Sequence, residues 1–179
     1  TCWQLDQDPM DFVGKTEEGI VMTRENAEFA LAHIRMVAGL EAELGTVKVE
    51  QFGVAYETAA VKVGGTADVV GYNLDKSILE IADLKTGMGY VDADSDQMKI
   101  YAIGAINKSK KMFDIVEMRI VQPRVGPVRT FSMTGEELTE WYSNTLGPAV
   151  DAITSPNPPY NPSPDACQWC PGKAVCPTQ

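Results

Sequence analysis

The segment GGTADVVGYNLDKSILEIADLKTG, residues 64–87, decides the fold class of this chain. Its apolar residues fall into two runs separated by the turn-forming tetrapeptide Asn-Leu-Asp-Lys at 73–76. Short apolar runs on either side of such a turn are typical of a β-hairpin. The sequence therefore predicts two paired strands, over residues 61–72 and 78–85.

Three charged residues lie within these predicted strands: Asp68 in the first, and Asp83 and Lys85 in the second. An isolated buried charge is costly, so such residues usually have a partner, a metal ion or a reaction to serve. Alternate strand residues face the same side, so Asp83 and Lys85 point together. If the hairpin register brings Asp68 beside them, the three groups converge on one patch.

Two neighbouring carboxylates repel each other, whereas a divalent cation stabilises both in the charged form. Magnesium suits oxygen ligands and can activate a water molecule for attack on a phosphoryl group, while Lys85 stabilises the added negative charge. A rival interpretation makes Asp83 and Lys85 an exposed surface pair and Asp68 a turn residue. The flanking apolar residues favour the first interpretation.

The rest of the chain predicts an α/β (α+β) fold in which a central mixed β-sheet is flanked by helices. Thr134-Gly-Glu-Glu137 matches a capping box that starts a last helix, which Pro148 should kink or end. Gln97 and Tyr101 are four residues apart and so share a helix face, although such a pair is ordinary by itself. The predicted elements are a helix over 23–44 with Thr23 as its N-cap, one bent strand or a strand pair over 47–56, a helix over 94–107, and strands over 113–121 and 128–133.

Composition limits the function. With 179 residues and a formal net charge of −10, the chain does not have the charge of a protein that coats nucleic acid. A DNA enzyme is still compatible, since metal-binding carboxylates count as negative and a local basic groove can exist on an acidic body. Lys108, Lys110 and Lys111 form the densest basic cluster, which also suits a solvated helix end. Neither a signal peptide nor a membrane span is predicted, which favours the cytoplasm.

GTAD at 65–68, IADLKTG at 81–87 and QMKIYAIGA at 97–105, in this order, resemble the PD-(D/E)XK nuclease superfamily. The resemblance is to its RecB-like branch, which includes phage exonucleases and CRISPR-associated nucleases. IVQPR at 120–124 and the cysteines near the C-terminus strengthen the likeness to phage exonucleases, and this resemblance covers almost the whole chain.

The resemblance implies a restriction-endonuclease-like core and assigns roles to individual residues. Asp68 and Asp83 would bind Mg²⁺ or Mn²⁺ with the backbone carbonyl of Leu84, and Lys85 would be the catalytic lysine. Gln97 and Tyr101 match the Gln-x-x-x-Tyr motif that helps hold the substrate strand.

One expected element of the family pattern is missing. Family members usually carry a further histidine ligand on an early helix, and we expect it in a segment upstream of Thr1. Glu50 on the first strand is a secondary carboxylate candidate for the metal, although the sequence favours an ordinary exposed strand glutamate.

The cysteines predict a metal centre near the C-terminus. Cys167, Cys170 and Cys176 are too closely spaced for an ordinary disulfide framework and suit a shared metal. By resemblance, they would hold a 4Fe-4S cluster with Cys2 as the fourth ligand; zinc is the main alternative. Cys2 is the least secure ligand, and the fourth cysteine could lie further upstream.

The expected organisation is a nuclease domain over 1–154 with an incomplete N-terminus, a proline-rich tether over 155–166 and a cysteine module over 167–179 packing on the domain. The expected function is a phage-encoded, metal-dependent DNA exonuclease acting in recombination, replication or DNA degradation. Its expected partners are DNA and a phage recombination or single-strand-annealing protein, and an oligomer is compatible with the resemblance. Two alternatives remain: a non-catalytic DNA-binding or assembly module with a structural Fe-S or zinc site, and a zinc-stabilised interaction domain.

Overall fold

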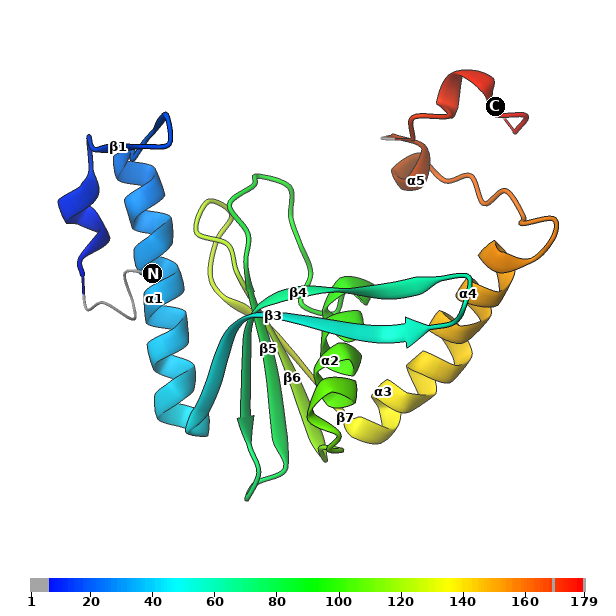
Figure 1. Cartoon of the computed structure of the whole chain (residues 1–179), viewed down its shortest axis with the longest axis horizontal. Coiled ribbons are helices and arrows are strands. Elements are labelled where there is room, and N and C mark those ends of the chain that lie inside the picture. The colour runs from blue at the N-terminus through cyan, green and yellow to red at the C-terminus, as the bar shows by residue number, and fades with distance from the viewer. Residues whose placement is uncertain (1–6, 169, 179) are drawn as a thin grey trace. The chain divides into compact units, whose positions relative to one another are not determined.

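A five-stranded mixed sheet forms the centre of the computed structural model, which describes residues 7–168 and 170–178. The strand order is β3-β4-β5-β6-β7; β5 and β6 are parallel, and all other neighbours are antiparallel. The predicted α+β class with a helix-flanked mixed sheet is confirmed (Figure 1). The strands are β3 (Thr46–Glu57), β4 (Lys62–Asn73), β5 (Ile78–Leu84), β6 (Ile115–Val121) and β7 (Arg129–Thr134).

Helix α1 (Arg24–Leu44) covers one face of this sheet. The Thr23 hydroxyl accepts a hydrogen bond of 3.1 Å from the Asn26 amide and caps the first turn, as the sequence predicts. The helix ends at Gly45, whose φ of +84° favours glycine. Its buried apolar side chains pack against the sheet: Met36, Val37, Leu40 and Leu44 on the helix, and Val69 and Ala82 on the strands.

The β4–β5 hairpin has the predicted position and turn. The Asn73 carboxamide accepts a hydrogen bond of 3.0 Å from the Lys76 amide, which closes the turn. Val69 pairs with Ala82 across the two strands, and both face α1. Since side chains alternate along a strand, Asp68 and Asp83 lie on the opposite face of the sheet.

Helix α2 (Asp96–Ser109) covers that opposite face (Figure 1). It approaches β3 through two glycines, because a Cβ added at Gly53 would lie 2.7 Å from the backbone of Gly104. β3 is a single long strand with a register shift between Val54 and Tyr56. The two acids of the hairpin and helix α2 therefore share one side of the sheet.

The capping box after β7 is present. The Glu137 amide donates to the Thr134 hydroxyl at 3.1 Å, and the Glu137 carboxylate accepts from the Thr134 amide at 2.7 Å. Helix α3 (Gly135–Trp141) starts there. Chain contacts divide the protein into two units, the first ending at Glu140 and the second beginning at Trp141.

After Trp141, the last residue of α3, the second unit continues with a π-helical turn, η2 (Tyr142–Leu146), followed by α4 (Gly147–Thr154). The predicted break near Pro148 therefore precedes the proline, which occupies the first turn of α4 where its missing N–H costs nothing. Residues 155–163 contain no helix or strand, and the unit continues with α5 (Pro164–Gln168) and η3 (Lys173–Val175).

Three short elements before α1 were not predicted: η1 (Pro9–Phe12), β1 (Thr16–Glu17) and β2 (Ile20–Val21). They are too short to produce a periodic apolar pattern. No helix in the described residues has the length and apolar character needed to cross a membrane.

Candidate active site

The two acids of the hairpin lie on adjacent strands. Oδ2 of Asp68 accepts a hydrogen bond of 2.7 Å from the backbone amide of Leu84, the residue after Asp83. The negative charge of Asp68 also contributes to a raised pKa at Asp83. This places both carboxylates at one point of the sheet, where β4 passes the end of β5.

Asp83 is buried, with 3% of its surface exposed. Burial is the main cause of its raised pKa, because the charged carboxylate loses water; the hydrogen bond and charge of Lys85 act in the opposite direction. The Lys85 ammonium lies 2.8 Å from Oδ2 of Asp83 and is partly exposed. The interpretation of Asp83 and Lys85 as an exposed surface pair, with Asp68 in a turn, is therefore wrong.

Helix α2 supplies the next two members of the site. The Lys85 ammonium donates a hydrogen bond of 3.2 Å to Oε1 of Gln97, and Nε2 of Gln97 donates one of 2.7 Å to the Tyr101 hydroxyl. The spacing of four residues places Gln97 and Tyr101 on the helix face that meets the strands. A continuous polar chain thus runs from Asp83 through Lys85 and Gln97 to Tyr101.

Gly65 makes room for this arrangement. A Cβ at Gly65 would lie 2.6 Å from Cε1 of Tyr101, so a larger residue would displace the tyrosine ring. The glycine of the Gly-Thr-Ala-Asp segment therefore has a packing role three residues before Asp68.

Glu50 lies beside Asp68 in the sheet register, because its neighbours Val49 and Gln51 pair with Val69 and Ala67. Its side chain is exposed and its φ is +50°. In the described part of the chain, no three Asp, Glu, His or Cys side chains are close enough to hold a metal ion, so Glu50 does not join the two aspartates.

Sequence reasoning assigned no structural role to Gln122 and Arg124 beyond their place in a motif. Both anchor the loop that follows Lys85. Nε2 of Gln122 donates to the carbonyls of Gly87 and Gly89 at 2.8 and 2.7 Å, and Nη1 of Arg124 donates to the Thr86 carbonyl at 2.8 Å. The signal in the sequence was the polar Gln-Pro-Arg directly after an apolar strand.

Arg129 completes the anchor. Its Nε donates to the Val91 carbonyl at 2.8 Å, and its Nη2 donates to Oε1 of the buried Gln122 at 2.5 Å. Its guanidinium also lies 4.7 Å from the centroid of the Tyr90 ring. The loop beside the candidate site thus presents Tyr90 and Met88, both largely exposed, on a backbone fixed by side chains from β7 and from the connection between β6 and β7.

The three cysteines of the second unit form no disulfide within the described residues. Cys167 and Cys176 are half-buried and Cys170 is exposed. A hydrogen bond with the Thr178 hydroxyl, 3.1 Å from Sγ, lowers the pKa of Cys176. The described residues do not bring the three thiols together as a metal site, and Cys2 lies outside the described residues.

Comparison with known proteins identifies the family. No curated protein matches this chain. A solved structure titled "Crystal structure of SSO0001" is similar at a TM-score of 0.42 and 12% identity, over 84% of this chain and 69% of that one. The family model described as "Protein of unknown function (DUF2800)" matches residues 15–179. This match spans nearly the whole sequence, and the chain therefore belongs to the DUF2800 family.

Proposed function

We propose that this protein is a divalent-metal-dependent DNA exonuclease with a restriction-endonuclease-like core of the RecB-like PD-(D/E)XK type. The observation that carries the proposal is the polar chain from Asp83 through Lys85 to Gln97, with Asp68 beside it. A structural surface pair would have no need to bury an aspartate at 3% exposure next to a second carboxylate.

The donor set fits Mg²⁺ or Mn²⁺. Both ions take oxygen ligands, and Mg²⁺ is commonly held by one or two carboxylates while keeping several waters. Burial and the charge of Asp68 raise the pKa of Asp83, because both disfavour its charged form. A bound divalent cation would favour the charged form and so offset both effects. Asp68 and Asp83 would hold the ion, and we keep the Leu84 carbonyl as a further proposed ligand.

When bound, the ion would polarise a phosphoryl oxygen and lower the pKa of a water molecule. Lys85 would stabilise the charge that develops on the phosphoryl group, because its ammonium is partly exposed yet fixed by Asp83 and Gln97. Gln97 and Tyr101 would orient Lys85 and contact the substrate strand without adding charge.

The direct test is digestion of linear DNA, single-stranded and double-stranded, with Mg²⁺, Mn²⁺ or EDTA. We expect shortening from strand ends with either metal and none in EDTA. Asp83→Asn should abolish it, while Asp75→Asn, an exposed acid in the hairpin turn, should leave it intact. Metal-independent DNA binding without cleavage by the wild type would instead favour the non-catalytic module.

We further propose that Cys167, Cys170 and Cys176 hold a 4Fe-4S cluster, with Cys2 or an upstream cysteine as the fourth ligand. Three thiolates within ten residues suit such a centre, and zinc is the rival occupant. Anaerobic purification followed by iron, sulfide and zinc analysis separates them. A brown protein with about four irons supports the cluster, whereas a colourless protein with stoichiometric zinc excludes it.

The same proposal extends to the protein's setting. An exonuclease of this type acts in the cytoplasm of a bacterial host, where a phage would use it in recombination, replication or DNA degradation. A single-strand-annealing protein is the proposed partner, because it would bind the strand that digestion exposes. Co-purification of the two from the same phage-infected cells would support this.

A further inference from the structure

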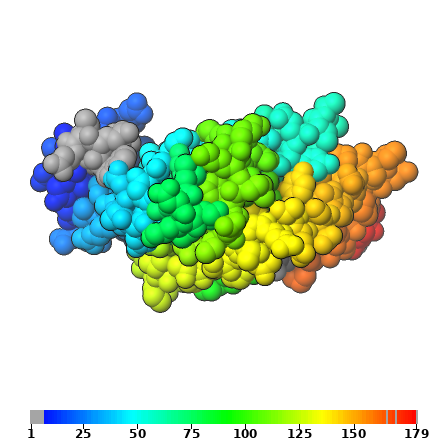
Figure 2. All heavy atoms as spheres, turned by 90° about the horizontal axis from the view of Figure 1, so that it is seen from below, coloured from blue at the N-terminus to red at the C-terminus, as the bar shows by residue number. Residues whose placement is uncertain are grey.

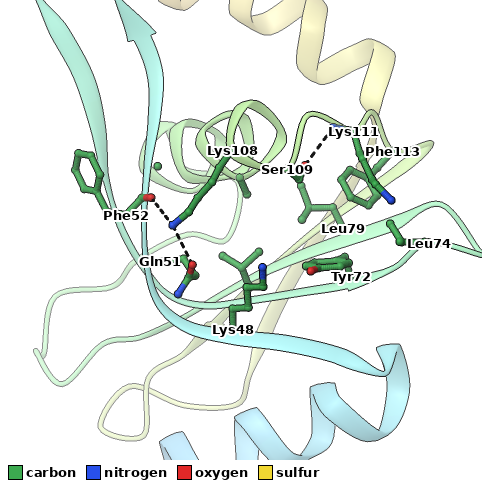
Figure 3. A pocket seen from close by; sticks show the side chains of 13 residues that line it. Lys48, Gln51, Phe52, Tyr72, Leu74, Leu79, Lys108, Ser109, Lys111 and Phe113 are labelled. Carbon is green, nitrogen blue, oxygen red and sulfur yellow. Dashed lines mark hydrogen bonds between the residues drawn. The ribbon is translucent and has the colours of Figure 1, made fainter.

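A pocket of about 300 Å³ lies between the sheet and the C-terminal half of α2, away from the candidate active site (Figure 3). Its walls come from β3, β4 and β5 and from the end of α2 with the residues that follow it. In the space-filling view from below, the green atoms of the β4–β5 turn lie beside the lime-green atoms of the end of α2 (Figure 2).

Three lysines line this pocket and no acid does. Lys48 comes from β3, Lys108 from α2 and Lys111 from the segment after it. None of the three forms an ion pair within the described residues, although the chain carries a net charge of −10. Lysines at a helix C-terminus can serve the helix dipole, but Lys48 on a strand cannot. The convergence indicates a site for an anion.

The ammonium groups of the three lysines differ in their contacts. The Lys108 ammonium is held by Oε1 of Gln51 at 3.0 Å and by the Phe52 carbonyl at 3.2 Å. Lys48 lies with its ammonium 5.7 Å from the centroid of the Tyr72 ring. In Figure 3, Lys48 rises from β3 and Lys108 reaches down from α2 toward Gln51. The hydrogen-bonded Lys108 ammonium and the exposed Lys48 and Lys111 thus surround the opening.

The remaining wall is aromatic and apolar. The Tyr72 and Phe113 rings lie with their centroids 6.3 Å apart at an angle of 51°, and the buried Leu79 lines the same pocket. An aromatic ring beside several lysines fits a ligand that carries both an anionic group and a flat apolar ring. A nucleotide has this composition, and an unpaired base can stack on an aromatic side chain.

The pocket and the candidate active site lie along the same helix and the same strands. Gln97 is in the first turn of α2 and Lys108 in its last turn, a separation of roughly 16 Å at ~1.5 Å per residue. About five nucleotides of a stacked strand, at ~3.4 Å each, cover that distance. We propose that the pocket holds a nucleotide of a single DNA strand whose end lies at Asp83 and Lys85.

This inference rests on the proposed nuclease function. It adds that the substrate is a single DNA strand and that this strand runs along α2 from the active site to the pocket. The phosphate of the held nucleotide contacts Lys48 and Lys111, and its base lies against Tyr72. A strand too short to reach from Lys85 to the pocket gains nothing from these residues.

Binding is measured by fluorescence anisotropy of a labelled 12-nucleotide deoxythymidine strand in EDTA. We expect Lys48→Ala and Lys111→Ala each to weaken binding about 3- to 10-fold and to reduce the slope of log affinity against log salt by about 0.7, the value for one lost phosphate contact. Tyr72→Leu should weaken binding about 5- to 100-fold. Lys15→Ala, which removes the same charge outside the pocket, should change neither quantity.

Hydrolysis gives the second measurement. In Mg²⁺, the lysine variants should raise KM for the 12-nucleotide strand about 5-fold at unchanged kcat. They should not affect the p-nitrophenyl ester of thymidine 5′-monophosphate, which reaches only the active site. If the wild type hydrolyses neither substrate, the nuclease proposal fails. The binding measurement still shows whether the pocket contacts the DNA strand. If wild type is active and Lys48→Glu and Lys111→Glu bind the strand normally, the pocket inference is overturned.

Two competitors test the identity of the ligand. Free thymidine monophosphate at millimolar concentration should displace little of the strand, because it lacks the remaining contacts along α2. Full displacement would show that the pocket takes a free nucleotide rather than a strand. Polyglutamate that binds as tightly as DNA, with the same dependence on Lys48, would show an acidic peptide site; either result overturns the proposal.

Discussion

The ammonium of Lys85 lies 2.8 Å from the buried carboxylate of Asp83, and the same ammonium donates a hydrogen bond to Gln97. A lysine with two such contacts has few accessible rotamers, so its position is set before any ligand arrives. Its partial exposure leaves it accessible to a phosphoryl oxygen. The first prediction concerns this residue.

Replacing Lys85 with alanine should reduce DNA hydrolysis about 100- to 1000-fold, because a fixed charge-stabilising donor is lost from the site. The rate of strand shortening in Mg²⁺ measures this effect. Lys62→Ala is the matched control, since Lys62 lies in the same hairpin, forms an exposed ion pair with Glu57 and has its ammonium 6.0 Å from the Phe52 ring centroid. Cleavage that persists unchanged in Lys85→Ala would reject the role assigned to this lysine.

Metal binding should stabilise the protein in a pH-dependent manner. Burial raises the pKa of Asp83, so its proton must leave before a cation binds, and Mg²⁺ affinity should rise with pH through the range in which this carboxyl loses its proton. Thermal unfolding should shift upward by about 4 °C at a Mg²⁺ concentration tenfold above the dissociation constant. Asp83→Asn should lose the shift while Asp75→Asn keeps it. An equal shift in both variants would place the ion elsewhere.

A second buried acid, Glu80 on β5, should make stability fall as pH rises. Burial raises the pKa of Glu80 to about 7 despite the Arg119 guanidinium, whose Nε lies 2.6 Å from Oε1. The unfolded chain releases this proton near pH 4.5, whereas the folded protein holds it until about pH 7. The stabilising contribution is therefore complete below pH 4.5 and lost as pH approaches 7, a change of about 3 kcal/mol at most.

Urea unfolding of wild type and Glu80→Gln between pH 4.5 and 8 isolates this contribution. Glutamine keeps the shape without titrating, so the variant should gain stability relative to wild type as pH rises. The lost contact with Arg119 adds an offset that does not vary with pH. Parallel stability profiles for the two proteins would contradict the assignment.

Gln122→Ala should loosen the loop after Lys85. The substitution leaves the Gly87 and Gly89 carbonyls and the Arg129 guanidinium without their partner, at a cost of about 2–4 kcal/mol. Amide hydrogen exchange over residues 86–91 should accelerate, and DNA hydrolysis should fall even though Gln122 does not touch Asp83 or Lys85. Gln7→Ala, at an exposed position, is the control. Unchanged exchange in the loop would show that Arg124 and Arg129 hold it alone.

Local features of this fold could be predicted because their causes are local. The Thr23 cap, the turn at 73–76 and the Thr134–Glu137 capping box each depend on side chains within four residues of the backbone groups they bind. Their positions in the structure match the prediction. The break near Pro148 was only partly predicted. The π-helical turn that precedes it depends on the hydrogen-bonding pattern of the backbone amides, which the residue types do not specify.

The candidate site depends partly on local residue spacing and partly on contacts between distant segments. Strand alternation alone places Asp83 and Lys85 together, and a helical spacing of four places Gln97 with Tyr101. Bringing Asp68 to Leu84 required the hairpin register, which the central turn allowed us to anticipate. The contact between Lys85 and Gln97 depended on how α2 docks against the strands, and it was not predicted from the sequence.

The sequence by itself determined the five strands of the central sheet, helices α1 and α2, the hairpin and the residue types that could bind metal, since each of these follows from periodicity and short-range hydrogen bonding. Only the tertiary structure decided that Gln122 fixes a loop more than thirty residues away and that Lys48 and Lys111 share one pocket. Such contacts join segments that are far apart along the chain, so no periodic pattern in the sequence predicts them. They exist because burying the faces of the sheet under α1 and α2 fixes where every attached side chain must lie.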